Sequence, residues 1–451
     1  MNHQPLQTIF DVYTEGAGPS STHSIGPQRA ARHFLRSLET APARVRVTLY
    51  GSLSATGRGH WTDRTVVRTL DPVPTEVVFD HSDAPLPHPN TMKFEAIDAA
   101  GTPYREWTVC SIGGGNLRNA DGTPVETDAL PVDYPVTGIQ EAMTYCRAND
   151  MPFWGLVEQT ESDLWPRLEA VWDTMEETVR RGLTSQQIIL PGTLELARRA
   201  GVIHHRAEAM QGTAGELGLI ASYALAVAEE NAAGGQIVTA PSCGAAGVLP
   251  AVLYFYKNVR KRPLRAILEA LATAGLFGSS IRANATVSGA EAGCQAEIGS
   301  ACSMAAAAAA QLMGGSLSQI EYAAEMAMEH NLGLTCDPIE GYVQIPCIER
   351  NMNAALRAVE TAIFALMTDG RHLVGFDDVI DVMASTGRDL QAAYRETSTG
   401  GLASLWRRDI EQRLGLGARG CSLQSELWTA FRVSLRLATS LPSVQPIVVR
   451  V

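Results

Sequence analysis

The chain has 451 residues, 45% of them hydrophobic and 19% charged, a composition that supports a large buried core and excludes a disordered protein. Lysine and arginine total 36 against 48 aspartates and glutamates, for a formal net charge of −12. Neither nucleic acid nor a membrane is therefore expected as a partner.

The first 150 residues mix turn residues with short runs that favour β-strands. Residues 44–50 (RVRVTLY) alternate polar and apolar side chains, and residues 77–79 and 107–112 also suit strands. Residues 29–38 favour a helix after a Gly-Pro start. We predict an α+β domain with a small mixed sheet over residues 1–150.

From about residue 160, Ala, Leu, Met and Glu dominate and strand-like alternation nearly vanishes. We predict an all-α domain over residues 160–401, reached through a connection at residues 128–151. Its helices are expected at residues 164–181, 195–210, 215–231, 263–272, 303–312, 318–329, 352–368 and 376–394. The alanine run 305–310 indicates either a closely packed helix or simply high helix propensity. Residues 402–451 form either an additional helix pair or a poorly ordered extension.

The sequence also limits location and cofactor chemistry. Its start lacks the features of an export signal, and no apolar run reaches the roughly 20 residues that cross a bilayer. We expect a cytoplasmic protein whose eight cysteines are metal ligands or buried thiols rather than disulfides. A lysine-bound pyridoxal phosphate would have only three possible anchors, Lys93, Lys257 and Lys261, and the last two lie in what we expect to be an exposed basic loop.

Cysteine spacing gives the strongest chemical signal. Cys294 lies in GCQAEIGSACSMAA, and Cys336 and Cys347 lie in CDPIEGYVQIPCIERN. Three thiolates are one fewer than the four that enclose a [4Fe–4S] cluster, which would leave one iron with an open, Lewis-acidic position. Two alternatives stay open: three buried, inert cysteines, or a four-thiolate zinc site that includes Cys302.

Polar residues near glycine-rich turns are candidate ligand contacts. Residues 20–23 (SSTH) form a hydroxyl and imidazole cluster before a helix, which indicates either carboxylate binding or helix capping. His60 and His88 are candidate bases, although single histidines in loops are more often solvated at the surface. The turn SIGGG, with Ser111 and Gly113, and the segment 229–253 indicate either ligand contact or tight local packing.

Together, these segments resemble the iron–sulfur L-serine dehydratase (L-serine ammonia-lyase) family in its single-chain bacterial form. The similarity covers residues 8–403. It rests on GPSSTHSIGPQRAA, GSLSATGRGHWTD, HPNTMKFEA, SIGGG, EENAAGGQIVTAPSCGAAGVLPAVL, GCQAEIGSACSMAAA, CDPIEGYVQIPCIERN and ETSTGGLA.

The resemblance implies an N-terminal domain similar to the allosteric substrate-binding domain of some phosphoglycerate dehydrogenases, a helical cluster-binding domain and a homodimer. It implies a [4Fe–4S] cluster, no pyridoxal phosphate, and one iron without a protein cysteine. The implied cluster ligands are Cys294, Cys336 and Cys347, and the implied catalytic residues are His60 and His88. The expected substrate-binding residues are Ser20, Ser21, Thr22, His23, Asn90, Ser111, Gly113, Thr239 and Ser242.

The implied reaction removes the Cα proton and the β-hydroxyl of L-serine and gives pyruvate and ammonia. The alternatives are a lyase for L-threonine or L-cysteine, or an iron–sulfur redox sensor, which would need a fourth cluster ligand. Two features depart from the family. Ser242-Cys243 stand where Thr-Asn is frequent, and about fifty residues follow GGLA, so Cys421 is not the terminal cysteine that some members carry.

Overall fold

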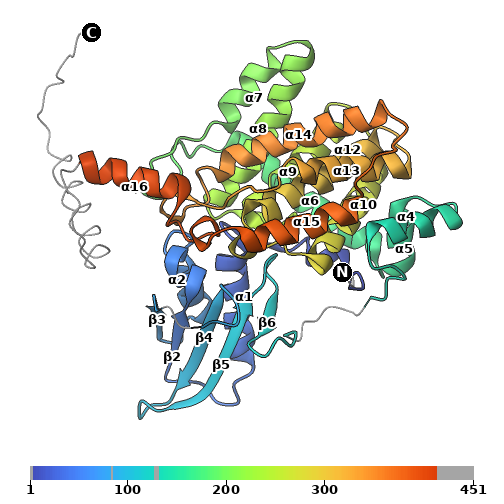
Figure 1. Ribbon diagram of the computed structural model, residues 1–451. Coiled ribbons are helices and arrows are strands. Elements are labelled where there is room, and N and C mark those ends of the chain that lie inside the picture. The colour runs from blue at the N-terminus through green and yellow to red at the C-terminus, as the bar shows by residue number, and fades with distance from the viewer. Residues whose placement is uncertain (1–3, 83–84, 126–131, 414–451) are drawn as a thin grey trace, which may run out of the picture. The chain divides into compact units, whose positions relative to one another are not determined.

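The computed structural model describes residues 4–82, 85–125 and 132–413 (Figure 1). Residues up to Ser404 belong to one unit, and a second unit begins at Leu405. The first unit combines a small sheet, built from residues 44–119, with a helical part that begins at residue 139. The predicted fold class is therefore confirmed, while the domain boundaries stay a prediction.

The sheet has five strands in the order β3-β2-β4-β5-β6. Their bounds are β2 (Arg44–Leu49), β3 (Thr75–Phe79), β4 (Thr91–Ile97), β5 (Pro103–Ser111) and β6 (Leu117–Asn119). β2 and β3 run parallel, and the other neighbours are antiparallel. Alternate residues of β2 are fully buried because they pack in one core with helices α1 (Gly26–Arg36) and α3 (Thr62–Leu70).

The helical part surrounds a central helix, α12 (Ser300–Leu312). It packs against α9 (Val248–Asn258), α10 (Leu264–Asn284), α13 (Leu317–Glu329) and α14 (Cys347–Leu366). All six alanines of the run 305–310 are fully buried, so the closely packed alternative is confirmed. The other helices are α4 (Ile139–Ala148), α5 (Phe153–Thr160), α6 (Leu164–Thr184), α7 (Ala200–Glu208), α8 (Gly212–Ala232), α11 (Gly289–Ala292), α15 (Phe376–Asp389) and α16 (Gly401–Arg413).

One helix in the described part of the chain, α10, is long and apolar enough to cross a membrane by length and composition. In this structure, 78% of its apolar window is buried inside the protein. Its apolar surface is therefore already used in the helical core.

Two predictions about element positions need correction, and one short strand was not predicted. The connection predicted at residues 128–151 is partly helical, because α4 occupies residues 139–148. After residue 160 strands nearly vanish, as predicted. The exception is the three-residue β7 (Gln236–Val238), which pairs antiparallel with β1 (Glu15–Ala17) and ties the N-terminal segment to the helical part. The helix predicted from residue 195 begins only at Ala200, because Ile189 pairs with Ala197 in an isolated bridge.

Two further predictions concern the end of the chain. The helix predicted over residues 376–394 ends at Asp389 and is followed by a separate short 3₁₀ turn. The prediction of either an additional helix pair or an extension over residues 402–451 falls mainly outside the described residues, which end within it at Arg413.

Candidate active site

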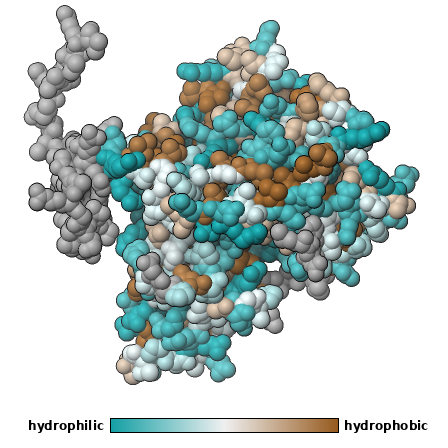
Figure 2. All heavy atoms as spheres, viewed as in Figure 1, coloured by the Kyte–Doolittle hydropathy of each residue, from teal (hydrophilic) through white to brown (hydrophobic). Residues whose placement is uncertain are grey.

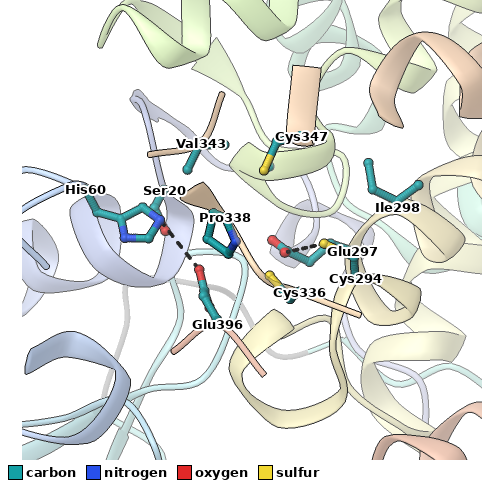
Figure 3. Close-up of a pocket in the computed structure, with 11 residues that line it drawn as sticks. Ser20, His60, Cys294, Glu297, Ile298, Cys336, Pro338, Val343, Cys347 and Glu396 are labelled. Atoms are coloured by element: carbon teal, nitrogen blue, oxygen red, sulfur yellow. Dashed lines mark hydrogen bonds and ion pairs between the residues drawn. The ribbon is translucent and has the colours of Figure 1, made fainter. Parts of the chain in front are cut away.

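A buried pocket lies where the sheet part meets the helical part of the first unit. Ser20 and His60 line it from the sheet part, and the helical part and the loops beside it contribute Gly244, Cys294, Glu297, Ile298, Cys336, Pro338, Val343, Cys347 and Glu396. Figure 3 shows His60 and Ser20 on one side of the view and the three cysteines on the other.

Three separate segments position the cysteines. Cys294 directly precedes the short helix η4 (Gln295–Gly299), and Cys347 is the first residue of α14. Cys336 lies in a loop between them, and all three are at most 8% exposed. The Sγ atoms of Cys294 and Cys336 and a carboxylate oxygen of Glu297 lie within 4.8 Å of one another.

A fixed positive charge lies beside these thiols. Arg350, one turn into α14, donates from Nη1 to the carbonyl of Thr335 at 2.6 Å. Burial opposes the charge of Arg350, but the nearby Cys294, Cys347 and Cys336 raise its pKa overall. The pKa of Cys347 is raised mainly by burial, and that of Cys336 first by its hydrogen bond with Cys294 and then by burial.

This donor set fits an iron–sulfur cluster. Thiolates are the ligands that such clusters take, and a coordinating metal deprotonates thiols that would otherwise stay neutral when buried. Cys302 is not part of the set: its Sγ donates to the carbonyl of Ala354 at 3.3 Å, and burial raises its pKa to about 12. The described residues therefore do not assemble the four-thiolate zinc site. The cysteines among them form no disulfide, as expected.

His60 presents a free ring nitrogen to the pocket. It follows the short helix α2 (Gly51–Thr56) and is fully buried, so the surface alternative for this residue is wrong. Its Nδ1 lies 3.0 Å from the carbonyl of Thr56, which can only accept, so Nδ1 carries the proton. Nε2 then holds a lone pair and has no hydrogen-bond partner among the described residues. Burial lowers the pKa of His60 to about 4, so the imidazole is neutral at pH 7.

A second histidine, His23, lies against His60 with ring centroids 4.3 Å apart. His23 belongs to the π-helical turn η2 (Ser21–Ile25), and burial followed by the nearby His60 lowers its pKa well below the usual value. Its Nε2 lies 3.0 Å from the hydroxyl of Thr56 and 3.2 Å from that of Ser52. Both hydroxyls donate elsewhere, to backbone carbonyls, so Nε2–H is the donor and Nδ1 carries the lone pair.

Glu396 comes from the loop after α15 and has a left-handed backbone, with φ of +58°. Two hydrogen bonds hold this conformation. The Glu396 N–H donates to the carbonyl of Cys336 at 2.8 Å, and the Glu396 carbonyl accepts from the Ser52 hydroxyl at 2.8 Å. The residue thus links the cysteine loop to the sheet part, and non-glycine residues in this conformation are frequent at functional sites.

The carboxylate of Glu396 points toward both histidines. Its Oε1 lies 3.6 Å from Nδ1 of His23 and 3.7 Å from Nε2 of His60, as Figure 3 shows for His60. Oε2 is buried without a hydrogen-bond partner in the part of the chain that the structure describes. Burial, followed by the nearby Glu297 and Cys294, raises the pKa of Glu396 well above the usual value.

His88 is also buried, so the surface alternative is wrong for it too, but both of its ring nitrogens are used. Nδ1 accepts from the backbone N–H of Asn90 at 3.0 Å, so Nε2 carries the proton and donates to Glu291 at 2.8 Å. Burial opposes ionisation of Glu291, but the hydrogen bond from His88 and further interactions lower its pKa overall. Thr286 donates to the other oxygen of Glu291. In this arrangement His88 fastens the sheet part to α11 and offers no free lone pair.

Other predicted contacts gather near the junction of the two parts. The Asn90 side chain donates to the carbonyl of Ser111 at 3.2 Å. Among the described residues, Oδ1 of Asn90 and Oγ of Ser111 are buried without partners. Gly113 has φ of +102°, and a Cβ there would meet Val287 at 3.1 Å, so glycine allows the turn to approach the helical part closely.

The remaining predicted residues differ in what they do. Ser20 caps η2 by accepting from the His23 N–H at 3.1 Å, and Ser21 and Thr22 are buried in the same turn. Ser242 lies next to Glu297 and lowers its pKa, although burial of Glu297 raises it overall. Thr239 donates to the carbonyl of Val12 and accepts from the N–H of Thr14, so it anchors the N-terminal segment, and this geometry gives no support to a substrate contact.

The three lysines lie outside the pocket lining in the described structure. Lys93 pairs with Glu95 and Glu106 on the sheet. Lys257 lies in the last turn of α9 and pairs with the buried Glu176 at 2.8 Å, so its predicted place in an exposed basic loop is wrong.

Sequence reasoning missed three charged residues of the site: Glu297, Arg350 and Glu396. Glu297 and Arg350 each lie three positions after a predicted cluster cysteine, and Glu396 opens the segment ETSTGGLA. The sequence did contain a signal for them: each is a charged residue inside a motif that was singled out for other residues.

Comparison with known proteins gives a consistent result. The family described as serine dehydratase beta chain matches residues 8–78, and that described as serine dehydratase alpha chain matches residues 91–403. A Streptomyces coelicolor protein named L-serine dehydratase is 41% identical over 448 residues, covering 88% of this chain and 98% of the relative. L-serine dehydratase 2 of Escherichia coli is 39% identical over 453 residues, with 88% and 98% covered. The L-serine dehydratase of Mycobacterium tuberculosis is also 39% identical, with 88% and 97% covered.

Proposed function

Because the chain belongs to the serine dehydratase family, with the beta-chain and alpha-chain regions joined in one polypeptide, we propose that it converts L-serine to pyruvate and ammonia. One observation carries the proposal: the free nitrogen of His60 and the thiols of Cys294, Cys336 and Cys347 line the same buried pocket. The reaction needs a base at Cα and a group that assists a poor leaving group, and the pocket offers a candidate for each.

We propose a [4Fe–4S] cluster as the cofactor, held by these three cysteines with one iron free of protein cysteine. When bound, the cluster supplies a Lewis-acid position for the substrate hydroxyl. Arg350 offsets part of the negative charge of the thiolates, and it fixes the Cys336 loop through the carbonyl of Thr335. The ion pairs of Lys93 and Lys257 support a mechanism without pyridoxal phosphate.

His60 is the proposed base. Nε2 takes the Cα proton, and the hydrogen bond from Nδ1 to the Thr56 carbonyl keeps the ring in the required tautomer and orientation. The electron pair of the Cα–H bond forms the new double bond, and the β-oxygen leaves with its bonding pair as hydroxide. That hydroxide takes back the proton held at Nε2 and departs as water, which restores the neutral imidazole. The resulting 2-aminoacrylate tautomerises to an imine, which water hydrolyses to pyruvate and ammonia.

The hydroxyl-rich wall is proposed to bind the substrate carboxylate. Ser20 lines the pocket, and Ser21 and Thr22 lie beside it in η2. The unpartnered polar atoms of Asn90 and Ser111 support a nearby polar ligand, because buried polar groups without partners are costly. His88 is proposed as a positioning residue rather than as the base, since both of its nitrogens are engaged.

L-Threonine and L-cysteine are the competing substrates. Three apolar residues, Ile298, Pro338 and Val343, line the pocket together with its polar groups. Turnover of the three amino acids side by side, with detection of pyruvate or 2-oxobutanoate, tests the assignment. Preference for serine supports it, and absence of turnover with all three contradicts the lyase function. A redox sensor has no need of the free imidazole beside the thiols.

A homodimer and a cytoplasmic location stay predictions. On the face drawn in Figure 2, hydrophobic surface gathers mostly over the helical part. The large apolar side chains that are exposed near the end of α14 and in the following loop include Ile363, Phe364, Met367, Leu373 and Val374. Such a surface favours association with another protein, and light scattering of the purified chain tests the dimer.

A further inference from the structure

Three hydrogen-bond acceptors converge at the proposed base: Nε2 of His60 itself, Nδ1 of His23 and Oε1 of Glu396. Nε2 of His60 and Nδ1 of His23 both carry lone pairs, as their other hydrogen bonds require. Both face Oε1 of Glu396, at 3.7 Å and 3.6 Å. These separations exceed the range of a direct hydrogen bond, so the three groups are not bonded to one another.

In the described part of the chain, the carboxyl group of Glu396 forms no ion pair with an arginine or a lysine. Within the described residues, the only basic side chains within 4.0 Å of Glu396 are the two histidines. The other carboxylate of the pocket, Glu297, differs, because Arg350 and the Cys294 thiol act on it. Without a cation beside it, burial raises the pKa of Glu396. A ligand that is cationic and donates several hydrogen bonds would hold this group ionised and satisfy the lone pairs around it.

We propose that Glu396 binds the α-ammonium group of the amino-acid substrate, with Nε2 of His60 and Nδ1 of His23 facing the same group; this inference rests on the proposed function. An ammonium group carries only donors and a positive charge, which matches a pocket corner lined by acceptors. His23 is the weaker acceptor of the two, because Nδ1 already lies 2.8 Å from the hydroxyl of Thr22.

The position also suits the reaction. The ammonium nitrogen is one bond, about 1.46 Å, from Cα. An ammonium held at Glu396 therefore places the Cα proton beside Nε2 of His60, which lies 3.7 Å from the same carboxylate oxygen. The strained backbone of Glu396, fixed to Cys336 and Ser52, holds that carboxylate in one place, as precise positioning of substrate requires.

The test compares ligands with and without the amino group on the anaerobically purified protein. L-Alanine keeps the ammonium and carboxylate of serine, and 3-hydroxypropanoate keeps its carboxylate and hydroxyl. We expect Glu396→Gln to weaken binding of L-alanine by about 10- to 100-fold, as loss of a charge-assisted hydrogen bond does. The affinity for 3-hydroxypropanoate should change by less than about threefold. Binding is measured by calorimetry, so the result does not depend on turnover.

The matched control is Glu340→Gln. Glu340 has the same left-handed backbone, with φ of +53°, but its carboxylate accepts from Thr193 rather than facing the histidines. It should leave both affinities unchanged. If Glu396→Gln does not fold, Glu396→Asp replaces it. Because aspartate is shorter by one methylene, its carboxylate lies farther from the histidines, and binding of L-alanine should weaken more than binding of 3-hydroxypropanoate.

Two outcomes would overturn the inference. In the first, both ligands lose affinity equally, or neither does, in the Glu396 variants. In the second, the variants lose affinity for Zn²⁺ while L-alanine binds as before, which would make the corner a two-histidine, one-carboxylate metal site. Failure of the proposed function is distinct, because the unmodified protein would then form no pyruvate from serine whatever the variants bind.

Discussion

Replacing His60 by glutamine removes the proposed base and keeps a donor for the Thr56 carbonyl. A general base contributes about 10²–10⁴-fold to a rate. Burial lowers the pKa of His60 to about 4, and a base this weak works below its best efficiency at pH 7, so the loss should lie near the lower end. We expect kcat to fall by about 10²–10³-fold, or about 2.7–4.1 kcal/mol of activation free energy. KM should change less, because Glu396 remains.

The assay is the initial rate of pyruvate formation from L-serine under anaerobic conditions, at matched iron content per chain. His88→Gln is the comparison, since its amide can still donate to Glu291 in place of Nε2. It should lower kcat by no more than about tenfold, as loss of one hydrogen bond implies. Near-normal kcat in His60→Gln, or a larger loss in His88→Gln than in His60→Gln, would refute the reasoning.

Three other predictions concern the thiols, pH and lysines. Cys302→Ser should keep its iron and visible absorbance while Cys347→Ser loses most of both, because Cys302 bonds to the Ala354 carbonyl away from the pocket; equal loss in the two variants would count against the ligand set. Between pH 7 and pH 4.5 the free energy of unfolding should fall by about 2–3 kcal/mol more in the unmodified protein than in His60→Gln. The lowered pKa of His60 means that the unfolded chain binds a proton which the folded chain does not, and urea titrations that show identical falls would contradict this. Lys93→Gln should keep kcat within about twofold, since it loses only a partly exposed ion pair. Borohydride reduction in the presence of serine should trap no adduct, and a trapped lysine adduct would contradict a mechanism without a lysine Schiff base.

Local patterns predicted most of the secondary structure. The alternation in residues 44–49 marked β2 because one face of that strand is buried against helices. Helix α4 lies within the predicted connection, although Ile139, Ala142, Met143 and Cys146 are buried at helical spacing. It has only ten residues and follows Pro135 and Gly138, which are typical of turns. Strand β7 has only three residues and pairs with a segment more than 200 positions earlier, so no local pattern could find it.

The sequence predicted those parts of the site whose residue types are typical of cluster binding or of acid–base chemistry. Three cysteines and the loop histidine His60 line one pocket, as a shared site requires. The role of Glu396 was not predictable, because it depends on a left-handed backbone and on contacts with residues 23 and 60, more than 300 positions away. The difference between His60 and His88 was not predictable either, since it rests on which ring nitrogens find partners in the folded chain.

The most direct test is iron and acid-labile sulfide analysis of the anaerobically purified protein, combined with a pyruvate assay on the same sample. About four iron and four sulfide per chain are expected, with turnover of serine that disappears together with the iron in Cys336→Ser. Serine turnover by a protein that contains no iron would contradict an active site built on Cys294, Cys336 and Cys347.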